Sequence, residues 1–163
     1  MKADALFVYN ILEGEKQYVV PVFQRYYSWQ EKHWVDLWGD ISSLSEEGVS
    51  KEHFIGAFVC MAGKHTPYKV PEYILVDGQQ RIVTITILLC ALRDLAEGND
   101  LRKRANEIQN KYLIDEYKDG PERYKVISRS RDRQFLLDMT DGKSLDGESR
   151  IVEAYRYFRR EIA

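Results

Sequence analysis

The sequence contains little cysteine, histidine or proline. It holds two cysteines, three histidines and four prolines in 163 residues. Cys60 and Cys90 lie within apolar runs, where free thiols behave as small hydrophobic side chains. The cysteines do not have the spacing of a zinc site, and His33, His53 and His65 are not spaced as metal ligands. The sequence therefore does not predict a metal centre built on these residues.

A long hydrophobic run is also missing. The most apolar segment, 82–92, is interrupted by Thr84 and Thr86 and is too short for a membrane span, which needs about 20 residues. The sequence has no recognisable secretion signal, so we expect a reducing, cytoplasmic location. Neither standard nucleotide fingerprint, G-x-x-x-x-G-K-[ST] or G-x-G-x-x-G, is present. No Ser-His-Asp or Cys-His grouping that would indicate nucleophilic catalysis can be identified either.

The composition is that of an ordinary folded domain. The hydrophobic fraction is 44% and the net charge is −2, so global attraction to nucleic acid is not predicted. Positive charge is concentrated locally, because residues 101–133 contain ten Lys or Arg against six Asp or Glu. This excess has two interpretations, a solvated helical face or a surface that contacts nucleic acid.

The stretch Tyr73–Leu95 is the most informative part of the sequence. Ile74–Val76 is typical of a short buried strand, and the long apolar segment after Gly78 predicts a central helix. Between them lie five polar or flexible residues, Asp77–Arg81. A helix that begins here directs its unpaired N–H groups and its positive dipole end outward, which favours an anion such as phosphate.

A similar polar corner occurs earlier in the chain. The segment 18–22 (YVVPV) predicts a strand that ends near Pro21, and Gln24 and Arg25 follow it, ahead of a helix with a buried Trp-Leu stripe. If the two strands are neighbours in one sheet, the two corners lie side by side at its carboxyl edge, where α/β sheets bind ligands. Tyr26, Tyr27 and Trp29 next to this corner could stack on a base or belong to the core.

The two corners together suit a nucleotide. Arg25 and Arg81 offer planar guanidinium groups for phosphate oxygens, Asp77 could bind Mg²⁺, and Gln79 or Gln80 could orient an attacking water. A structural interpretation stays open at this point. In it, Arg81 pairs with Asp77, and the glutamines cap the helix and hold the loop.

The remaining pattern predicts an α+β protein. Phe54–Met61 is expected to be a central strand, joined by a hairpin loop at 63–71 to the strand at Ile74. We expect a core in residues 1–100 with the strands in the first half of the chain, and a helical extension in residues 101–163. The last amphipathic helix continues to Ala163 without a stop signal, which favours an N-terminal part of a longer protein.

The motifs resemble a known family. VPVFQRYYSW, the helix with Trp34, Leu37, Trp38 and Asp40, FIGAFV, and ILVDGQQRIVTITILLCALRDL are similar to the N-terminal domain of GmrSD-type restriction endonucleases. The DGQQR motif at a helix start and the upstream (I/V)PxFQRxYxW segment carry the resemblance. The similarity is strong over residues 18–95 and looser from there to residue 163.

The resemblance implies a fold and a function. It implies a ParB/sulfiredoxin-like small mixed β-sheet flanked by helices, with a helical C-terminal tail. It also implies that the domain binds and hydrolyses nucleoside triphosphates with Mg²⁺ or another divalent metal, in defence against phage DNA with modified bases or backbone. DNA cleavage would belong to a C-terminal His-Me finger nuclease domain or subunit. A non-catalytic module that senses DNA or nucleotide is the alternative, and a homo-oligomer is left open.

The resemblance also assigns residues. Its signature comprises Asp77, Gly78, Gln79, Gln80 and Arg81, with Asp77 as the metal ligand, and Gln24 and Arg25 stand in the upstream motif. Gly56 corresponds to a family glycine in the middle strand. Val83 replaces one of two threonines that often follow the signature, so any hydroxyl contribution to nucleotide binding rests on Thr84.

Overall fold

The computed structural model describes residues 5–44, 52–64 and 66–163, and it shows a mixed α+β fold. The expected α+β class is therefore confirmed. The helices are α1 (Val8–Leu12), α2 (Glu31–Ser43), α3 (Gln79–Gly98), α4 (Arg102–Ile108), α5 (Arg133–Thr140) and α6 (Arg150–Ile162). The strands are β1 (Gln17–Val20), β2 (Val59–Ala62), β3 (Glu72–Asp77) and β4 (Val126–Ser128). A π-helical turn (Gln109–Leu113) and a 3-10 turn (Gly120–Arg123) lie between α4 and β4.

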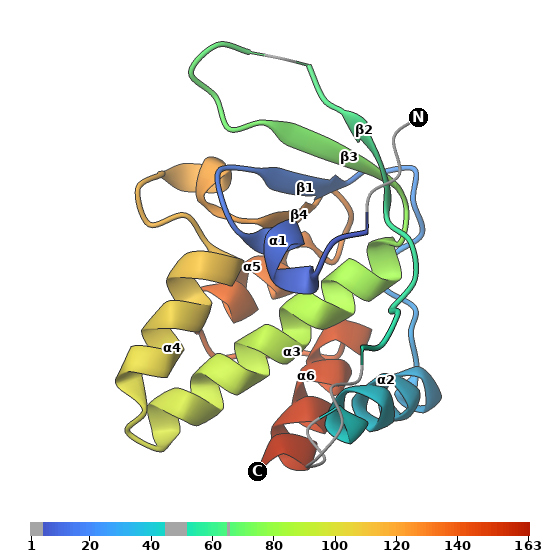
Figure 1. The fold of residues 1–163 in the computed structure, drawn as a ribbon, viewed down its shortest axis with the longest axis vertical. Coiled ribbons are helices and arrows are strands. Elements are labelled where there is room, and N and C mark those ends of the chain that lie inside the picture. Colours follow the sequence, from blue (N-terminus) through green and yellow to red (C-terminus); the bar gives the residue numbers. More distant parts are fainter. Residues whose placement is uncertain (1–4, 45–51, 65) are drawn as a thin grey trace.

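The four strands form one sheet in the order β2-β3-β1-β4. Strand β1 is parallel to both β3 and β4, while β2 is antiparallel to β3. In Figure 1 the sheet lies above, and helices α3, α4, α5 and α6 lie below it. Because β3, β1 and β4 run in the same direction, the loops that follow them leave the sheet at the same edge.

Strand β2 differs from the prediction of a central strand over Phe54–Met61. Only the segment from Val59 onward pairs with β3, and β2 is an edge strand. In the preceding segment Gly56 has a φ of +95°, outside the extended range of a strand, and the carbonyl of Ala57 accepts a hydrogen bond from Arg81. The predicted hairpin connection between β2 and β3 is confirmed.

Strand β4 contradicts the expectation that the strands lie only in the first half of the chain. Val126 pairs with Tyr18 and Ser128 with Val20, so a segment after residue 100 completes the sheet. The hydrophobic core likewise combines side chains from before and after residue 100, including Leu75, Ile82, Leu136 and Phe158.

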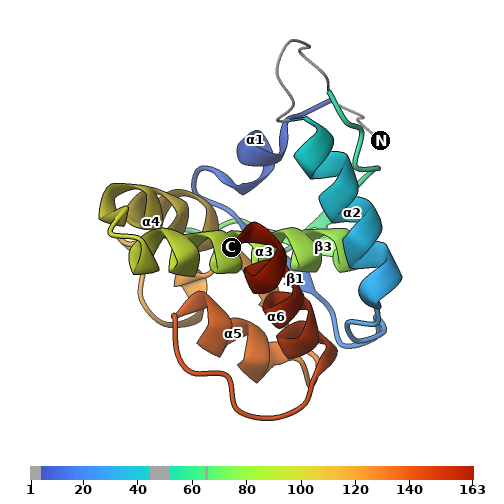
Figure 2. The ribbon, with the colours of Figure 1, turned by 90° about the horizontal axis from the view of Figure 1, so that it is seen from below.

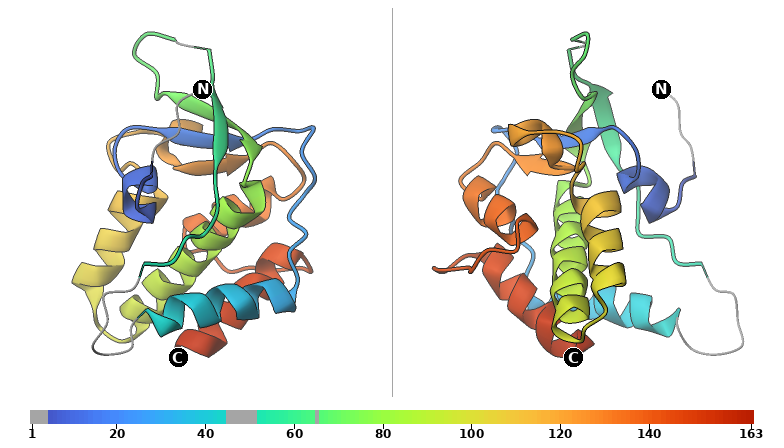
Figure 3. Two further views of the ribbon diagram at one scale, coloured as in Figure 1. Left: turned by 45° about the vertical axis from the view of Figure 1, so that its right-hand side comes forward. Right: turned by 90° about the vertical axis from the view of Figure 1, so that its left-hand side faces the viewer.

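Helix α3 is the centre of the molecule. It runs from the sheet edge between α4 on one side and α5 and α6 on the other, as the right-hand view of Figure 3 shows, and Figure 2 shows it from below. Ile87, Cys90 and Ala91 are completely inaccessible to solvent, which confirms the predicted all-round burial. Within the described ranges, none of the helices combines the length and apolarity needed to cross a bilayer.

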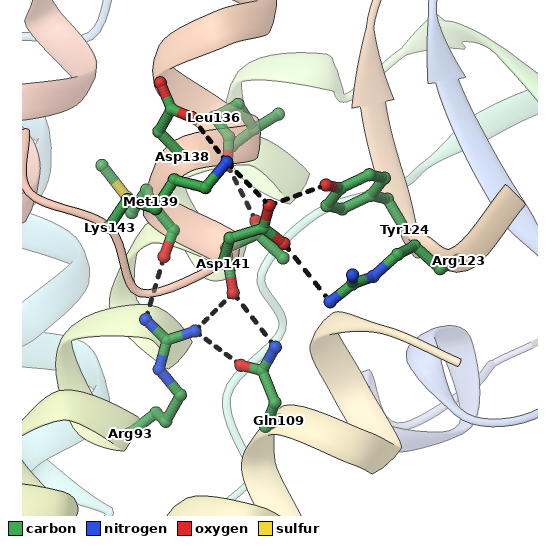
Figure 4. Close-up of polar contacts among 10 residues, drawn as sticks. Arg93, Gln109, Arg123, Tyr124, Leu136, Asp138, Met139, Asp141 and Lys143 are labelled. Carbon is green, nitrogen blue, oxygen red and sulfur yellow. Dashed lines mark hydrogen bonds and ion pairs between the residues drawn. The ribbon is translucent and has the colours of Figure 1, made fainter. Parts of the chain in front are cut away.

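A buried arginine attaches α5 to α3 (Figure 4). Arg93 is 5% exposed and donates to the carbonyl oxygens of Thr140 at 2.6 Å and Met139 at 2.9 Å. It also donates to Gln109 Oε1 at 2.5 Å and pairs with Asp94 at 2.8 Å. The last carbonyls of a helix have no intrahelical partner, and Arg93 adds charged donors to two of them. The carbonyl of Thr140 also accepts from Gln109 Nε2 at 3.1 Å, and that of Met139 from the N–H of Gly142 at 3.1 Å.

Asp141 forms a second contact cluster at the same helix end (Figure 4). Its carboxylate accepts a hydrogen bond from Tyr124 Oη at 2.9 Å and pairs with Arg123 and Lys143, both at 3.3 Å. Tyr124 lies two residues before β4, so this cluster connects α5 to the approach of that strand. Together with Arg93, it fixes α5 and therefore the position of the loop between β4 and α5.

Candidate functional site

The two predicted polar corners lie side by side, because β1 and β3 are adjacent parallel strands. The side chain of Gln79 donates from Nε2 to Gln24 Oε1 at 2.9 Å. Gln24 in turn donates to the carbonyl oxygen of Val76, at the end of β3, at 3.0 Å. The expected arrangement of the corners at one edge of the sheet is therefore confirmed.

Helix α3 begins at a glycine for a steric reason. Gly78 is the N-cap residue and has φ +89° and ψ 6°, a left-handed conformation that favours glycine. A Cβ at this position would lie 2.8 Å from Phe58 Cδ1 and 3.0 Å from the carbonyl oxygen of Ala57. Among the described residues no side chain caps the helix, so the predicted capping role of the glutamines is not observed. The positive end of this 20-residue helix is thus left without a side-chain acceptor.

Arg81 points toward the segment before β2. It donates from Nη2 to the carbonyl oxygen of Ala57 at 2.6 Å and lies 3.8 Å from Asp77 Oδ2. Its Cζ lies 5.8 Å from the centre of the Phe58 ring, and its Nε atom is buried without a hydrogen-bond partner. The side chain as a whole is 30% exposed. The suggested contact between Arg81 and Asp77 exists, but it is long and leaves donor capacity on the guanidinium.

Asp77 is the most accessible charged group at this corner, with 70% of its side chain exposed. Within the part of the chain that the structure describes, no group of three or more His, Cys, Asp or Glu could hold a metal ion by itself. A cation bound at Asp77 would therefore need oxygen ligands from a bound substrate or from water.

Arg25 lies on the other side of the helix start. It is exposed and lines a small cavity of about 10 Å³, a volume sufficient for about one water molecule. Gln79 and Gln80 line the same cavity. Arg25 and Arg81 thus flank the beginning of α3, with Arg25 toward β4 and Arg81 toward β2.

Gln80 holds the loop that follows β1. It is 7% exposed, accepts a hydrogen bond from the backbone N–H of Ser28 at 2.8 Å, and donates to the carbonyl oxygen of Tyr26 at 3.1 Å. Both ends of its carboxamide are therefore engaged by the main chain. This geometry is that of the structural interpretation, in which a glutamine holds the loop.

Thr84 is a buried residue that links the helix start to the core. It is completely buried, donates to the carbonyl oxygen of Gln80 at 2.7 Å, and lies 2.7 Å from the phenolic oxygen of Tyr27. That phenolic oxygen also accepts a hydrogen bond from Trp34 Nε1 at 2.8 Å. Burial raises the pKa of Tyr27, and the hydrogen bonds with Thr84 and Trp34 partly oppose the rise. Thr84 therefore supports the two corners and is not accessible to a ligand.

The aromatic residues at the corner divide between core and surface. Tyr27 is buried and belongs to the core, whereas Tyr26 is 49% exposed. Trp29 is partly buried and its ring lies 5.5 Å from that of His33 in a stacked arrangement. Of these three aromatic residues, Tyr26 is the most exposed at the carboxyl edge of the sheet.

A third loop, Ser128–Arg133, lies at the same edge and was not predicted as part of the site. It follows β4, and Ser128, Ser130 and Asp132 line the cavity that Arg25 also lines. The carboxylate of Asp132 accepts a hydrogen bond from the backbone N–H of Tyr27 at 2.7 Å. The signal for this loop in the sequence is the run Ser-Arg-Ser-Arg-Asp-Arg directly after Val126 and Ile127.

Comparison with known proteins gives one family match. A family model described as "GmrSD restriction endonuclease, N-terminal domain" matches residues 8–162. The matched range includes all three loops at the carboxyl edge of the sheet. The search for similar curated proteins finds no match.

Proposed function

The chain belongs to the GmrSD restriction endonuclease N-terminal domain family, and on this basis we propose that it binds and hydrolyses a nucleoside triphosphate. The nucleotide would regulate a restriction endonuclease that acts on modified phage DNA. One observation carries the proposal. Two arginines, Arg25 in the loop after β1 and Arg81 in the first turn of α3, flank a helix start that has no side-chain cap among the described residues.

The phosphate groups would lie at the beginning of α3. There the backbone N–H groups and the helix dipole favour negative charge. The cavity beside Arg25 is too small for a triphosphate, and Gly78, Gln79 and Gln80 are buried, so the phosphates would lie at the surface beside the helix start, where Asp77 and Arg25 are exposed. Arg81 would turn its remaining donors toward them from the side of β2.

The residues present fit a nucleotide-bound Mg²⁺. In nucleotide sites Mg²⁺ is typically bound by one or two carboxylates, by waters and by phosphate oxygens of the substrate. A single exposed carboxylate beside a phosphate site matches this requirement, so Asp77 would hold the ion. The ion supplies charge neutralisation at the phosphate oxygens.

Of the two glutamines in the signature, Gln79 is better placed to orient the attacking water. Both polar atoms of the Gln80 carboxamide are bound to the main chain of the preceding loop. Gln79 donates from Nε2 to Gln24, and within the described residues its Oε1 has no hydrogen-bond partner. We therefore assign Gln80 to loop positioning and Gln79 to the water that attacks the terminal phosphate.

The wider setting of the domain is also a proposal. A ParB/sulfiredoxin-like relationship is compatible with the small mixed sheet and the helices packed on it. DNA would be the partner in the full protein, with a His-Me finger nuclease domain or subunit performing the cut. The family description, which names a restriction endonuclease, supports this setting.

Phosphate release tests the proposal. Release from GTP and from ATP would be measured with Mg²⁺ for the wild-type protein, for Arg81→Ala and for Arg102→Ala. Arg102 is a matched control, because it is exposed and follows the opposite end of α3, a helix about 30 Å long. We expect loss of release for Arg81→Ala and unchanged release for Arg102→Ala. Equal release from wild type and Arg81→Ala would overturn the mechanism.

A non-catalytic sensing module is the second candidate. It is favoured by the exposed arginines Arg25 and Arg131, which have no acidic partner among the described residues. A DNA complex held by phosphate contacts would weaken steeply with salt, because phosphate contacts release counterions. DNA affinity that is constant between about 50 and 200 mM salt would argue against it.

A purely structural corner is the remaining alternative. In that case Arg81→Ala would lower the melting temperature, and none of the four triphosphates with Mg²⁺ would raise it. A melting temperature of the wild-type protein that increases with one of the triphosphates would exclude this alternative, because a ligand that binds only the folded state stabilises it.

A further inference from the structure

The loop between β4 and α5 carries an arginine whose role neither the sequence motifs nor the family description assigns. We propose that Arg131 is a third nucleotide-binding residue, which donates hydrogen bonds to the phosphates at the start of α3. This inference rests on the proposed function and extends it to a residue 50 positions after the DGQQR signature.

The position of the loop supports this assignment. Strand β4 is parallel to β1, so the loop after β4 leaves the sheet beside Arg25 and the beginning of α3. Ser128 and Ser130 line one cavity together with Arg25 and Gln79. The loop therefore lies directly beside Arg25 and the beginning of α3.

Charge pairing singles out Arg131 among the three arginines of the loop. Arg129 pairs with Glu72 at 3.3 Å, and Arg133 is partly buried with a donor 3.5 Å from the carbonyl oxygen of Ser128. Arg131 is exposed, and no acidic side chain among the described residues pairs with it. Its charge is therefore available to an anionic ligand.

The guanidinium of Arg131 is also held in place for such a contact. Its Cζ lies 3.8 Å from the centre of the Tyr26 ring, the distance expected for a guanidinium stacked on the ring face. Stacking occupies the face of the group and leaves the N–H donors around its edge free, and these are the atoms that bind phosphate oxygens.

The loop that carries Arg131 is fixed at several points. Asp132 accepts from the backbone N–H of Tyr27 at 2.7 Å, and the hydroxyl groups of Ser128 and Ser130 lie 2.8 Å apart. Helix α5, which follows the loop, is anchored to α3 through Arg93. A preorganised arginine loses less entropy on binding than a mobile one, so it can contribute more to affinity.

The test compares Arg131→Gln with Arg129→Gln. Both variants remove one positive charge from the same loop, but only Arg131 has an unpaired guanidinium. Dissociation constants for GTP and ATP with Mg²⁺ would be measured by calorimetry, together with melting temperatures. We expect Arg131→Gln to bind about tenfold more weakly than wild type and Arg129→Gln to stay within about twofold. Both variants should melt near the wild-type temperature, because both side chains are exposed.

The outcomes separate this inference from the proposed function. If wild type binds a triphosphate and the two variants bind equally well, the role of Arg131 is refuted while the proposed function stands. If wild type binds neither GTP nor ATP, both are refuted. If Arg131→Gln melts at a lower temperature, Arg131→Lys decides the question, since it keeps the charge without the planar donors. Wild-type affinity in that variant would refute a planar guanidinium contact with phosphate.

Discussion

The guanidinium of Arg81 occupies the space in which a side chain at Gly56 would begin. A Cβ built on Gly56 would lie 2.5 Å from Nη1 and 2.9 Å from Cζ of Arg81. The backbone of Gly56 also has a φ of +95°, which side chains other than glycine rarely tolerate. Gly56 is therefore required for two reasons: its own backbone conformation favours glycine, and a larger residue would displace Arg81.

Substitution Gly56→Ala should lower stability and displace Arg81. We expect a loss of about 1–3 kcal/mol in the free energy of unfolding from the backbone conformation, together with weaker triphosphate binding. Urea denaturation and calorimetry measure the two effects. Gly39→Ala is the control, because a Cβ there meets nothing within 4 Å and the position lies inside helix α2. It should be neutral or stabilising by up to about 1 kcal/mol. Similar losses for both variants would contradict the steric role of Gly56.

Gln80→Ala should destabilise the protein more than Gln79→Ala, although both side chains are 7% exposed. Gln80 bonds to the backbone of Ser28 and Tyr26, so its removal leaves two main-chain groups without partners. Within the described part of the chain, the Gln79 side chain bonds only to that of Gln24, which is partly exposed. We expect a loss of about 1–3 kcal/mol for Gln80→Ala and less than about 1 kcal/mol for Gln79→Ala. Phosphate release should show the reverse order: Gln79→Ala should lose more activity than a folded Gln80→Ala variant, since Gln79 is assigned to the attacking water. If one of the two variants had the larger effect on both stability and phosphate release, the division of roles would be contradicted.

Tyr27→Phe should cost about 1–3 kcal/mol of unfolding free energy, because the buried indole N–H of Trp34 loses its acceptor. The same substitution removes the contact with Thr84. A double-mutant cycle with Thr84→Val measures this coupling by denaturation. We expect Thr84→Val to be less destabilising in the Tyr27→Phe background, by about 0.5–1 kcal/mol. Fully additive effects would show that the 2.7 Å contact between the two hydroxyls contributes nothing.

Arg93→Met should destabilise the fold by about 2 kcal/mol or more. The substitution keeps an apolar stem of similar length but removes the charged hydrogen bonds to the carbonyls of Met139 and Thr140, and it takes the guanidinium partner from Asp94. Arg104→Met is the matched control, since the Arg104 side chain is 74% exposed and, among the described residues, pairs only with Glu107 on the same helix. It should change stability by less than about 0.5 kcal/mol. Equal unfolding midpoints for the two variants would show that the contacts in Figure 4 do not anchor α5.

The two motif corners could be predicted because their signals are local. The strand at Ile74, the corner at Asp77 and the central helix follow one another within Tyr73–Leu95, and each is marked by apolar periodicity or by a glycine. The late start and edge position of β2 could not be predicted in this way. The segment before Val59 contains Gly56 with a φ of +95° and the carbonyl of Ala57, which accepts from Arg81, 24 positions later in the chain.

The separate roles of residues within the corners could not be predicted from the sequence pattern either. Gln79 and Gln80 are adjacent and chemically identical, and only their different partners in the fold separate them. The third loop was missed for a similar reason. The sequence indicates a short extended piece at residues 124–127, but the local pattern does not show that β4 pairs with a strand more than 100 positions earlier, which is what places the loop beside the two corners.

The α+β class, the central buried helix and the chemistry of the two arginine-bearing corners follow from side-chain polarity and from the spacing of neighbouring residues, so they can be predicted from the sequence. Which polar groups remain available to a ligand depends on the fold. Hydrogen bonds between distant segments engage Gln80 and Thr84 inside the protein, and an ion pair engages Arg129, whereas Arg25, Asp77 and Arg131 stay exposed at the edge of the sheet. Whether a polar side chain is free to bind a ligand depends on its partners in the folded protein, and these partners come from distant parts of the chain.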